Sequence, residues 1–245
     1  MNVVVFSGTT EGRSFSRVLA ALGAAVTVCV ATELGAEEQG CADGITVRTG
    51  RLDAEGMTAL LRGAALCVDA THPYAAEATR NIRAAAAAAG VEYHRLLRPA
   101  SPLPAGSVVL ADAARAAGVS GRQTPGRVLL ATGAKELPAF AALDPARLYP
   151  RVLPTLAGIA ACEAAGVPHR NILAMQGPFT KELNAALLHQ FHIDYMVTKD
   201  GGAAGGFAEK AEAAARCSVQ LIVLRRPDDE GETADTILQR CRELL

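Results

Sequence analysis

Tryptophan is absent from this chain of 245 residues, and aromatic residues make up only 4% of it. Apolar residues make up 50% of the chain, and small ones, chiefly alanine and valine, carry much of that content. Small apolar side chains suit helices that pack closely on a sheet, and a chain of this length can bury a sizeable core. The length allows one large α/β domain or two smaller ones.

Long apolar runs are also missing. No stretch reaches the roughly 18 apolar residues that a transmembrane helix needs. A secretory signal has a basic segment before its apolar stretch, and no such segment precedes the first apolar stretch here. Lys and Arg number 24 against 25 Asp and Glu, so the basic excess typical of nucleic-acid-binding proteins is absent. We therefore expect a cytoplasmic protein that binds neither membranes nor nucleic acid.

Motifs for metal binding and for nucleophilic catalysis are lacking as well. The six Cys residues form no Cys-x-x-Cys pair, and the five His residues are scattered. We predict no metal site and cysteines that stay reduced in the cytosol. No Gly-x-Ser-x-Gly nucleophile elbow occurs, so a Ser-His-Asp hydrolase is not expected.

What the chain does contain is a regular alternation of strand-like and helix-like segments. Residues 3–6 are a short apolar run, typical of a buried strand, and Phe15, Val18, Leu19 and Leu22 then recur at the spacing of one helix face. Similar pairs follow as far as the C-terminus. Strands that alternate with helices predict an α/β fold whose parallel sheets are covered on both faces.

The alternation falls into two similar halves. Residues 66–99 and 195–227 each comprise an apolar strand, a polar turn, an Ala-rich helix and a strand that ends in Leu-x-Arg-Pro. Chance similarity between two Ala-rich units is the alternative explanation. We predict two Rossmann-like halves, residues 1–105 and 106–245, with a cleft between them. Their boundary is expected within residues 100–126, which are rich in Pro, Gly and Ser.

The turns that follow strands are the candidate sites, because ligands of open α/β sheets bind beyond the carboxyl ends of the strands. The first turn opens a helix, whose free N–H groups favour a phosphate. It matches neither Gly-x-Gly-x-x-Gly nor the P-loop, and its glycines could serve turn geometry alone. The candidate cofactor-binding residues here are Gly8, Thr9, Thr10, Glu11 and Arg13.

The next two turns give conflicting signals about the choice of dinucleotide. Glu33, after the second strand, could bind the ribose hydroxyls of NAD and repel the phosphate of NADP, or it could be a solvated loop charge. Arg51 could instead bind that phosphate. The sequence therefore leaves open whether the chain binds NAD or NADP.

A further turn joins an apolar strand to the Ala-rich helix and reads Asp69-Ala70-Thr71-His72-Pro73-Tyr74. Asp69 is either buried with partners or facing a ligand. His72 could donate a proton near neutral pH, because the unperturbed pKa of histidine is about 6.5, or it could be structural. Thr71 joins the candidate cofactor-binding residues.

Three turns of the second half carry lysine at the start of a helix, where acidic residues are normally favoured. These lysines are Lys135, Lys181 and Lys199, and they indicate either an anionic ligand or simple exposure. The turn at residues 198–206 is rich in glycine, so its backbone could pack against a large flat ligand. The candidate substrate-binding residues are Lys135, Lys199, Asp200, Gly201 and Gly202.

Taken together and in order, these turns resemble those of the precorrin-6A reductase (cobalt-precorrin-6A reductase) family. The matching segments lie between residues 3 and 226, at 6–13, 50–52, 69–75, 132–135, 176–179 and 197–202. The family usually has Ser where this chain has Gly201, so the hydroxyl that such a side chain would offer is missing.

The resemblance implies an NAD(P)H-dependent oxidoreductase that acts on a CH–CH group in cobalamin biosynthesis. It would reduce one ring double bond of precorrin-6A or cobalt-precorrin-6A, a carboxylated tetrapyrrole. The family favours NADPH, with NADH the alternative because of Glu33, and His72 or water would supply the proton. The segments within residues 176–206 favour the cobalt-bearing substrate, and the oligomeric state is not predicted.

Two other classes of function stay open at this point. One is a sugar-nucleotide epimerase-type Rossmann enzyme, which usually needs a Tyr-x-x-x-Lys pair. The other is a non-catalytic small-molecule binding protein, although two-lobed binders are often secreted and the chain has no recognisable signal.

Overall fold

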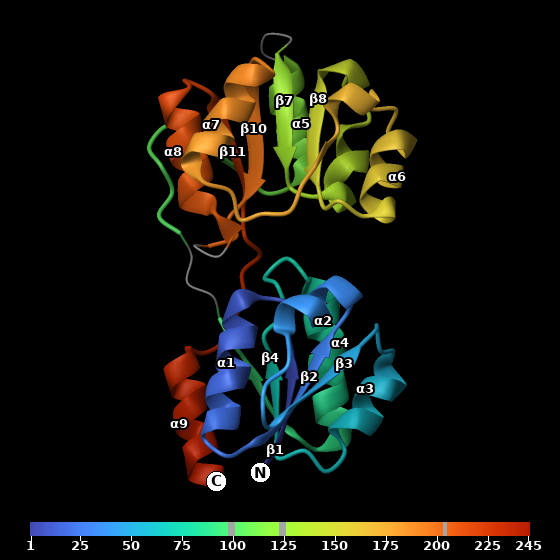
Figure 1. Ribbon diagram of the computed structural model, residues 1–245, viewed down its shortest axis with the longest axis vertical. Helices are drawn as coiled ribbons and strands as arrows, with labels where there is room; N and C mark the ends of the chain where they lie inside the picture. Colours follow the sequence, from blue (N-terminus) through green and yellow to red (C-terminus); the bar gives the residue numbers. More distant parts are fainter. Residues whose placement is uncertain (98–100, 123–125, 203–204) are drawn as a thin grey trace. The chain divides into compact units, whose positions relative to one another are not determined.

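The computed structural model describes residues 1–97, 101–122, 126–202 and 205–245. The chain forms two compact units. The first comprises Met1–Arg98 together with Pro227–Leu245, and the second comprises Pro99–Arg226. Each unit is a parallel sheet covered by helices on both faces (Figure 1), which confirms the predicted α/β fold with two Rossmann-like halves.

The first unit is built on a five-stranded sheet in the order β3-β2-β1-β4-β5, and all its pairings are parallel. Its strands are β1 (Asn2–Phe6), β2 (Ala25–Val30), β3 (Ile45–Thr49), β4 (Leu66–Asp69) and β5 (Glu92–Arg95). Its helices are α1 (Thr10–Ala21), α2 (Glu33–Gln39), α3 (Ala54–Leu61), α4 (Ala76–Ala89) and α9 (Ala234–Leu244). Because β2 and β4 flank β1, the strand order reverses there, and in open α/β sheets ligands bind at the carboxyl ends of the strands at such a reversal.

Alternate residues of β1 enter two separate cores. Val3 and Val5 pack against α1 and α9 on one face of the sheet, whereas Val4 and Phe6 pack against α3 and α4 on the other (Figure 1). The side chains of a strand alternate between its faces, so a run that is apolar at every position is buried on both. This explains why the run at residues 3–6 reads as a continuous apolar strand.

The second unit has a six-stranded parallel sheet in the order β6-β11-β10-β7-β8-β9. Its strands are β6 (Val108–Leu110), β7 (Arg127–Ala131), β8 (Leu148–Val152), β9 (Leu173–Ala174), β10 (Ile193–Lys199) and β11 (Gln220–Leu224). Its α-helices are α5 (Ala113–Arg122), α6 (Leu156–Ala164), α7 (Lys181–Gln190) and α8 (Phe207–Arg216), and its 3-10 helices are η1 (Ala134–Phe140), η2 (Pro145–Arg147) and η3 (His169–Asn171). The order reverses between β7 and β10, so the turns after these two strands are neighbours.

The predicted halves are wrong at the C-terminus, because residues 227–245 belong to the first unit rather than to the half predicted at 106–245. The apolar stripe of α9 explains this return: Ile237 and Cys241 are fully buried in the core that α1 and β1 share. An isolated parallel bridge between Leu96 and Glu232 joins the returning segment to the end of β5.

The boundary predicted within residues 100–126 falls just before that range, because the second unit begins at Pro99. The range itself contains β6, which pairs with β11 at the edge of the second sheet, and α5, whose Ala116 is fully buried. Short strands and Ala-rich helices carry weak periodic signals, so Pro and Gly at their ends dominate the pattern. Residues 98–100 and 123–125 of this region lie outside the described residues.

Replacing Ile237 by Ala should destabilise the first unit by about 2–5 kcal/mol, because it leaves a cavity in a closely packed core. Amide hydrogen exchange would then accelerate in β1 and α1 rather than in β7 and β10. Gln239→Ala, on the exposed face of the same helix, is the matched control. Faster exchange confined to the second unit would contradict the placement of α9.

Candidate functional site

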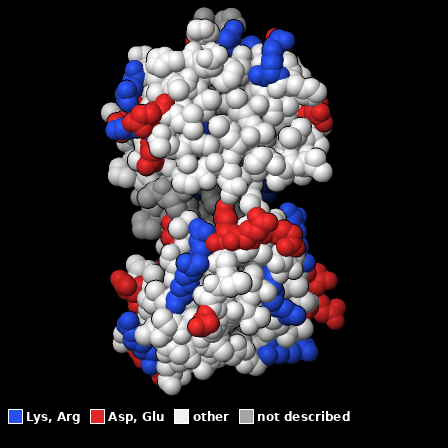
Figure 2. Space-filling view, in the orientation of Figure 1, with Lys and Arg blue, Asp and Glu red and all other residues white. Residues whose placement is uncertain are grey.

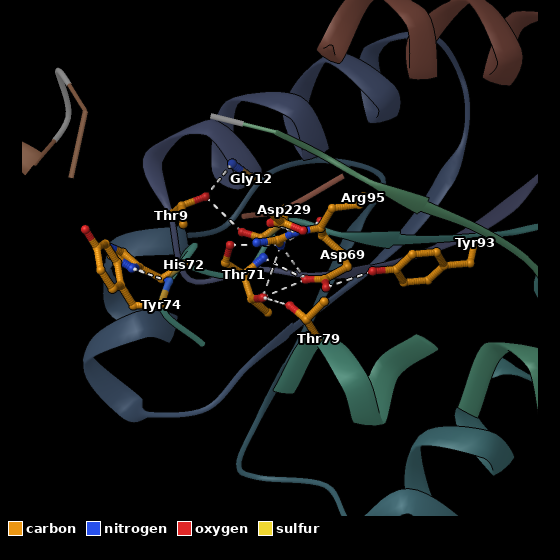
Figure 3. Close-up of polar contacts among 11 residues, drawn as sticks. Thr9, Gly12, Asp69, Thr71, His72, Tyr74, Thr79, Tyr93, Arg95 and Asp229 are labelled. Atoms are coloured by element: carbon orange, nitrogen blue, oxygen red, sulfur yellow. Dashed lines mark hydrogen bonds and ion pairs between the residues drawn. The ribbon is translucent and has the colours of Figure 1, made fainter. Parts of the chain in front are cut away.

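The turn after β1 is tied to the turn after β4 by one hydroxyl (Figure 3). Thr9 is the N-cap of α1: its Oγ1 accepts a hydrogen bond from the Gly12 N–H at 3.0 Å and donates to the Ala70 carbonyl oxygen at 2.9 Å. The hydrogen of this hydroxyl is therefore used within the protein. A phosphate at this turn would be bound by backbone N–H groups rather than by the Thr9 side chain.

The other predicted residues of this turn divide by their contacts. Gly8 and Thr10 are exposed, and Gly8 has a φ of +143°, a conformation that favours glycine. Arg13 donates to the Glu38 carbonyl oxygen at 2.5 Å and to Thr10 Oγ1 at 3.3 Å, so it links α1 to the end of α2. Glu11 is half-buried in the first turn of α1.

Gly12 is a structural requirement that the sequence prediction did not include. A Cβ atom at this position would lie 2.6 Å from Ser7 Oγ and 2.8 Å from the Ala70 Cβ. Only glycine therefore lets the start of α1 pack this closely against the turns after β1 and β4. A glycine at the beginning of an otherwise regular helix was the available signal.

The two charged residues that give opposite indications about the dinucleotide lie just after β2 and β3. Glu33 is exposed in the first turn of α2, which Thr32 caps, and Arg51 is exposed two residues after β3. Since β2 and β3 are paired, both residues lie along the same edge of the sheet. Figure 2 shows acidic side chains gathered over α2 beside basic side chains over α1.

The sequence left open whether Asp69 is buried with partners or faces a ligand, and the structure shows that it is buried with partners (Figure 3). Its Oδ1 accepts hydrogen bonds from the Thr71 N–H at 3.0 Å, Thr71 Oγ1 at 2.7 Å and Arg95 Nη1 at 2.9 Å. Its Oδ2 accepts a hydrogen bond from the Tyr93 hydroxyl at 3.1 Å. Burial and the neighbouring Asp69 carboxylate raise the pKa of the Tyr93 phenol, so Tyr93 stays a donor.

Arg95 was missed by the sequence prediction, although its signal is a charged residue inside a strand. It is 3% exposed, and it also donates from Nη1 to the Thr71 carbonyl oxygen at 3.0 Å and from Nε to Asp229 Oδ2 at 2.8 Å. Thr71 is thus bound on both its backbone and its side chain. The Thr71 hydroxyl and carbonyl oxygen are therefore already hydrogen-bonded within the protein, and the predicted binding of cofactor by Thr71 stays a prediction.

His72 follows Thr71 and is half-buried. Its Nδ1 lies 3.4 Å from the Tyr74 backbone N, with the N–H directed at the ring nitrogen, and the rings of His72 and Tyr74 are 5.5 Å apart. With Nδ1 as the acceptor, Nε2 carries the proton of the neutral ring. His72 thus lies at the carboxyl edge of the sheet, with one ring nitrogen facing the backbone of its own turn.

A cavity of about 360 Å³ opens beside this network. Pro73, Thr79, Arg80 and Arg83 line it from the side of α4, and residues 227–230 line it from the returning segment. Thr79 Oγ1 lies 3.3 Å from Thr71 Oγ1, which joins the cavity wall to the Asp69 network.

In the second unit, the turns after β7 and β10 meet as predicted from their place in the sheet. Lys199 Nζ forms an ion pair with Glu136 Oε1 at 2.8 Å, and Lys135 is exposed beside it in η1. Lys181, at the start of α7, pairs instead with Glu212 on α8 at 2.8 Å. Lys135 precedes Glu136 in the chain, so Lys135 and Lys199 lie on turns that the Lys199–Glu136 ion pair joins, and their role in substrate binding stays a prediction.

Asp200 organises the Gly-rich turn. It is 5% exposed, and its carboxylate accepts hydrogen bonds from the Gly202 N–H at 3.0 Å and the Ser101 N–H at 3.1 Å. Gly202 has a φ of +67°, and a Cβ on Gly201 would lie 3.2 Å from the Gly205 Cα. Residues 203–204 of this turn lie outside the described residues.

Two cations near this turn were also missed, Arg151, which is buried, and Lys210, which is half-buried. Arg151 on β8 is 6% exposed, donates to Asn184 Oδ1 at 2.8 Å and lies 4.3 Å from the centre of the Phe179 ring. Lys210 on α8 donates to the Gly205 carbonyl oxygen at 2.6 Å. Burial and the charge of Arg151 lower the pKa of Lys210 to about 8. Arg151 lies within a fully buried strand and Lys210 among the charged residues of an amphipathic helix, so no local signal marked either one.

The epimerase alternative fails on geometry. Tyr195 and Lys199 do have the spacing of a Tyr-x-x-x-Lys pair, but both lie on strand β10. Residues four apart on a strand are separated by about 13 Å, whereas on a helix they are neighbours. Tyr195 is moreover buried in the core, so the two side chains do not form one acid–base unit.

Within the described ranges, no helix is long and apolar enough to cross a membrane. The same residues include no group of three or more His, Cys, Asp or Glu that could hold a metal ion.

Comparisons with known proteins agree with this architecture over nearly the whole chain. Residues 2–242 match the family described as Precorrin-6x reductase CbiJ/CobK. The chain is 34% identical over 237 residues to a cobalt-precorrin-6A reductase of Priestia megaterium, which covers 94% of this chain and 92% of that protein. It is 37% identical over 235 residues to a cobalt-precorrin-6A reductase of Salmonella typhimurium, covering 92% and 88%.

A solved structure described as CobK precorrin-6A reductase has the same fold. It matches with a TM-score of 0.77 at 26% identity and covers 99% of this chain and 96% of that one. The resemblance carried by the strand-end turns is therefore confirmed, and the chain belongs to the precorrin-6x reductase family, CbiJ/CobK.

Proposed function

We propose that the chain reduces one ring double bond of cobalt-precorrin-6A with hydride from NADPH. Its family consists of reductases of cobalamin biosynthesis that use a nicotinamide cofactor. The observation that carries the proposal for this chain is the joined pair of turns after β1 and β4, at the point where the strand order reverses. A dinucleotide bound there would place one end near His72.

The start of α1 fits a pyrophosphate. The first N–H groups of a helix have no partner within it, and the helix dipole adds a partial positive charge. Exposed Gly8 leaves room beside the backbone, since nothing lies within 4 Å of the position that a Cβ would take. Gly12 keeps the turn close to β4. These residues would hold the diphosphate mainly through their backbone.

The ends of β2 and β3 would hold the adenosine end. Arg51 is the residue we assign to the 2′-phosphate of NADPH, and Glu33 is the residue that would instead favour NADH. Glu33 also has a structural role, because an acidic side chain in the first turn of α2 stabilises that helix. This role weakens its value as a marker for NADH and favours NADPH.

The turn after β4 would receive the nicotinamide end. When bound, the nicotinamide supplies hydride to one carbon of the double bond. The neighbouring carbon then needs a proton, and His72 is the donor we propose, in its imidazolium form, which becomes the neutral imidazole when the proton leaves. Thr71, held by Asp69 and Arg95, fixes the backbone before His72. Ordered water is the alternative donor.

The turns of the second unit would bind the carboxylates of the macrocycle. Lys135 is exposed and suits a carboxylate directly, whereas Lys199 would first exchange its ion pair with Glu136. Asp200 holds the backbone of Gly201 and Gly202 in a shape that a flat ring can approach. The predicted cleft between the halves stays a prediction.

The start of α1 can be tested with Thr10→Glu. An acidic side chain at an exposed helix start is compatible with the fold but repels a pyrophosphate. We expect the KM for NADPH to rise about tenfold, equivalent to about 1.4 kcal/mol. Ser14→Glu, exposed one turn further along α1, should leave this KM unchanged. Equal KM values in the two variants would place the pyrophosphate elsewhere.

The reaction and the choice of cofactor can be tested in one turnover assay, with cobalt-precorrin-6A and precorrin-6A each supplied with NADPH or NADH. We expect NADPH oxidation only when a tetrapyrrole is present, and faster turnover of the cobalt form. Arg51→Gln should raise the KM for NADPH about tenfold, about 1.4 kcal/mol, and leave that for NADH unchanged. Arg62→Gln, exposed at the end of α3, is the control. A parent enzyme that prefers NADH would contradict the assignment of Arg51.

Proton donation by His72 predicts a pH-dependent kcat. An acid donates only when protonated, so kcat should fall as the pH rises through the pKa of the donor. His72→Asn should remove this fall and lower kcat about 100-fold, the lower range for a lost general acid. A variant with parent-like kcat and pH profile would leave water as the donor.

A further inference from the structure

The chain leaves the first unit after β5 and returns to it at Pro227, and the two stretches lie side by side. The Glu232 N–H donates to the Arg95 carbonyl oxygen at 2.8 Å, and the Leu97 N–H donates to the Glu232 carbonyl oxygen at 2.9 Å. A Cβ on Gly231 would collide with the Arg95 backbone and side chain. The returning segment is thus packed directly on Arg95.

The Arg95 side chain connects this segment to the turn after β4. One edge of its guanidinium donates from Nε to Asp229 Oδ2 at 2.8 Å. Its Nη1 lies 2.9 Å from Asp69 Oδ1, 3.0 Å from the Thr71 carbonyl oxygen and 3.2 Å from Thr71 Oγ1. Figure 3 shows Asp229 and Thr71 on opposite sides of this guanidinium.

We propose that Arg95 and Asp229 form a latch, in which Asp229 orients the Arg95 guanidinium and Arg95 holds the Thr71–His72 backbone in its reactive position. Both are positioning residues, since neither is placed against substrate or cofactor. The latch rests on the proposed function, because it acts through the turn that carries the proton donor. It assigns a role in the reaction to a segment 157 residues further along the chain than His72 (229 − 72).

The charges in the network explain why Asp229 is needed. Arg95 is almost fully buried, and an arginine that faces Asp69 alone could rotate about its long side chain. A second carboxylate on Nε fixes the plane of the guanidinium, because Arg presents its donors in a rigid fork. Asp229 is 17% exposed, so its pairing with Arg95 is only weakly screened by solvent.

The latch is tested with Asp229→Ala and Asp229→Asn, and Asp228→Asn is the matched control in the same segment. Because a misplacement of about 1 Å can cost about 100-fold in rate, we expect Asp229→Ala to lower kcat by about 10- to 100-fold. KM for NADPH and for the tetrapyrrole should stay within about twofold of the parent values. Asp229→Asn, which keeps an oxygen for Arg95 Nε, should lose less.

Amide hydrogen exchange gives a readout that does not depend on activity. Exchange at residues 70–75 should accelerate in Asp229→Ala and stay at the parent rate in Asp228→Asn. Should Asp229→Ala fail to fold, the same comparison is made with Asp229→Asn. A parent-like kcat with unchanged exchange, or a loss confined to KM, would overturn the latch.

A double-mutant cycle separates the latch from the proposed role of His72. If Asp229 acts through His72, Asp229→Ala should reduce kcat no further in a His72→Asn background. Equal reductions in both backgrounds would show that the pair acts elsewhere and overturn the latch as stated. If His72→Asn alone has parent activity, the proton assignment fails, and the kcat of Asp229→Ala against Asp228→Asn then decides whether the pair positions another group of this turn.

Discussion

The carboxyl edge of the first sheet depends on one buried carboxylate. Asp69 is fully removed from water, and a buried charge is costly unless it is paired and hydrogen-bonded. The three residues that satisfy it come from the following turn, Thr71, and from β5, Tyr93 and Arg95. Satisfying this charge therefore fixes the geometry of two segments at once. Losing Arg95 would leave the Asp69 charge uncompensated, at a cost of about 3–5 kcal/mol.

The second unit repeats this device with different partners. Asp200 follows β10 as Asp69 ends β4, and each carboxylate accepts the N–H of the residue two positions later, Gly202 or Thr71. An aspartate that bonds backbone ahead of it is a common way to form a tight turn. In the first unit the charge is balanced by Arg95, whereas the Asp200 carboxylate also binds the Ser101 N–H. The echo seen between residues 66–99 and 195–227 is therefore matched by a shared turn geometry.

Local patterns predicted what local physics decides. The apolar run at residues 3–6 and the helical spacing from Phe15 to Leu22 are enough to predict a strand and a helix. The alternation of strands and helices then predicts a parallel sheet, in which the turns after the strands lie at the same edge. Contacts between distant residues left no such signal: Arg95 and Asp229 are 134 positions apart. The amphipathic pattern of α9 predicted a helix but could not say which of two similar sheets it covers. Nor could the sequence show that the Thr9 hydroxyl donates to the Ala70 carbonyl oxygen, because this hydrogen bond depends on how closely Gly12 lets the turns after β1 and β4 approach each other.

The return of the chain at Pro227 makes the first unit discontinuous, whereas the second is one continuous segment. Residues 1–97 are synthesised before the second unit, yet their sheet lacks α9 and the partner of Leu96 until residues 232–244 are made. The second unit has all its strands by residue 224. Domains usually complete in the order in which they are synthesised. Here the order is reversed: the first unit lacks the α9 part of its core and the partner of Leu96 until residues after Pro227 are synthesised, whereas the second unit already has β11.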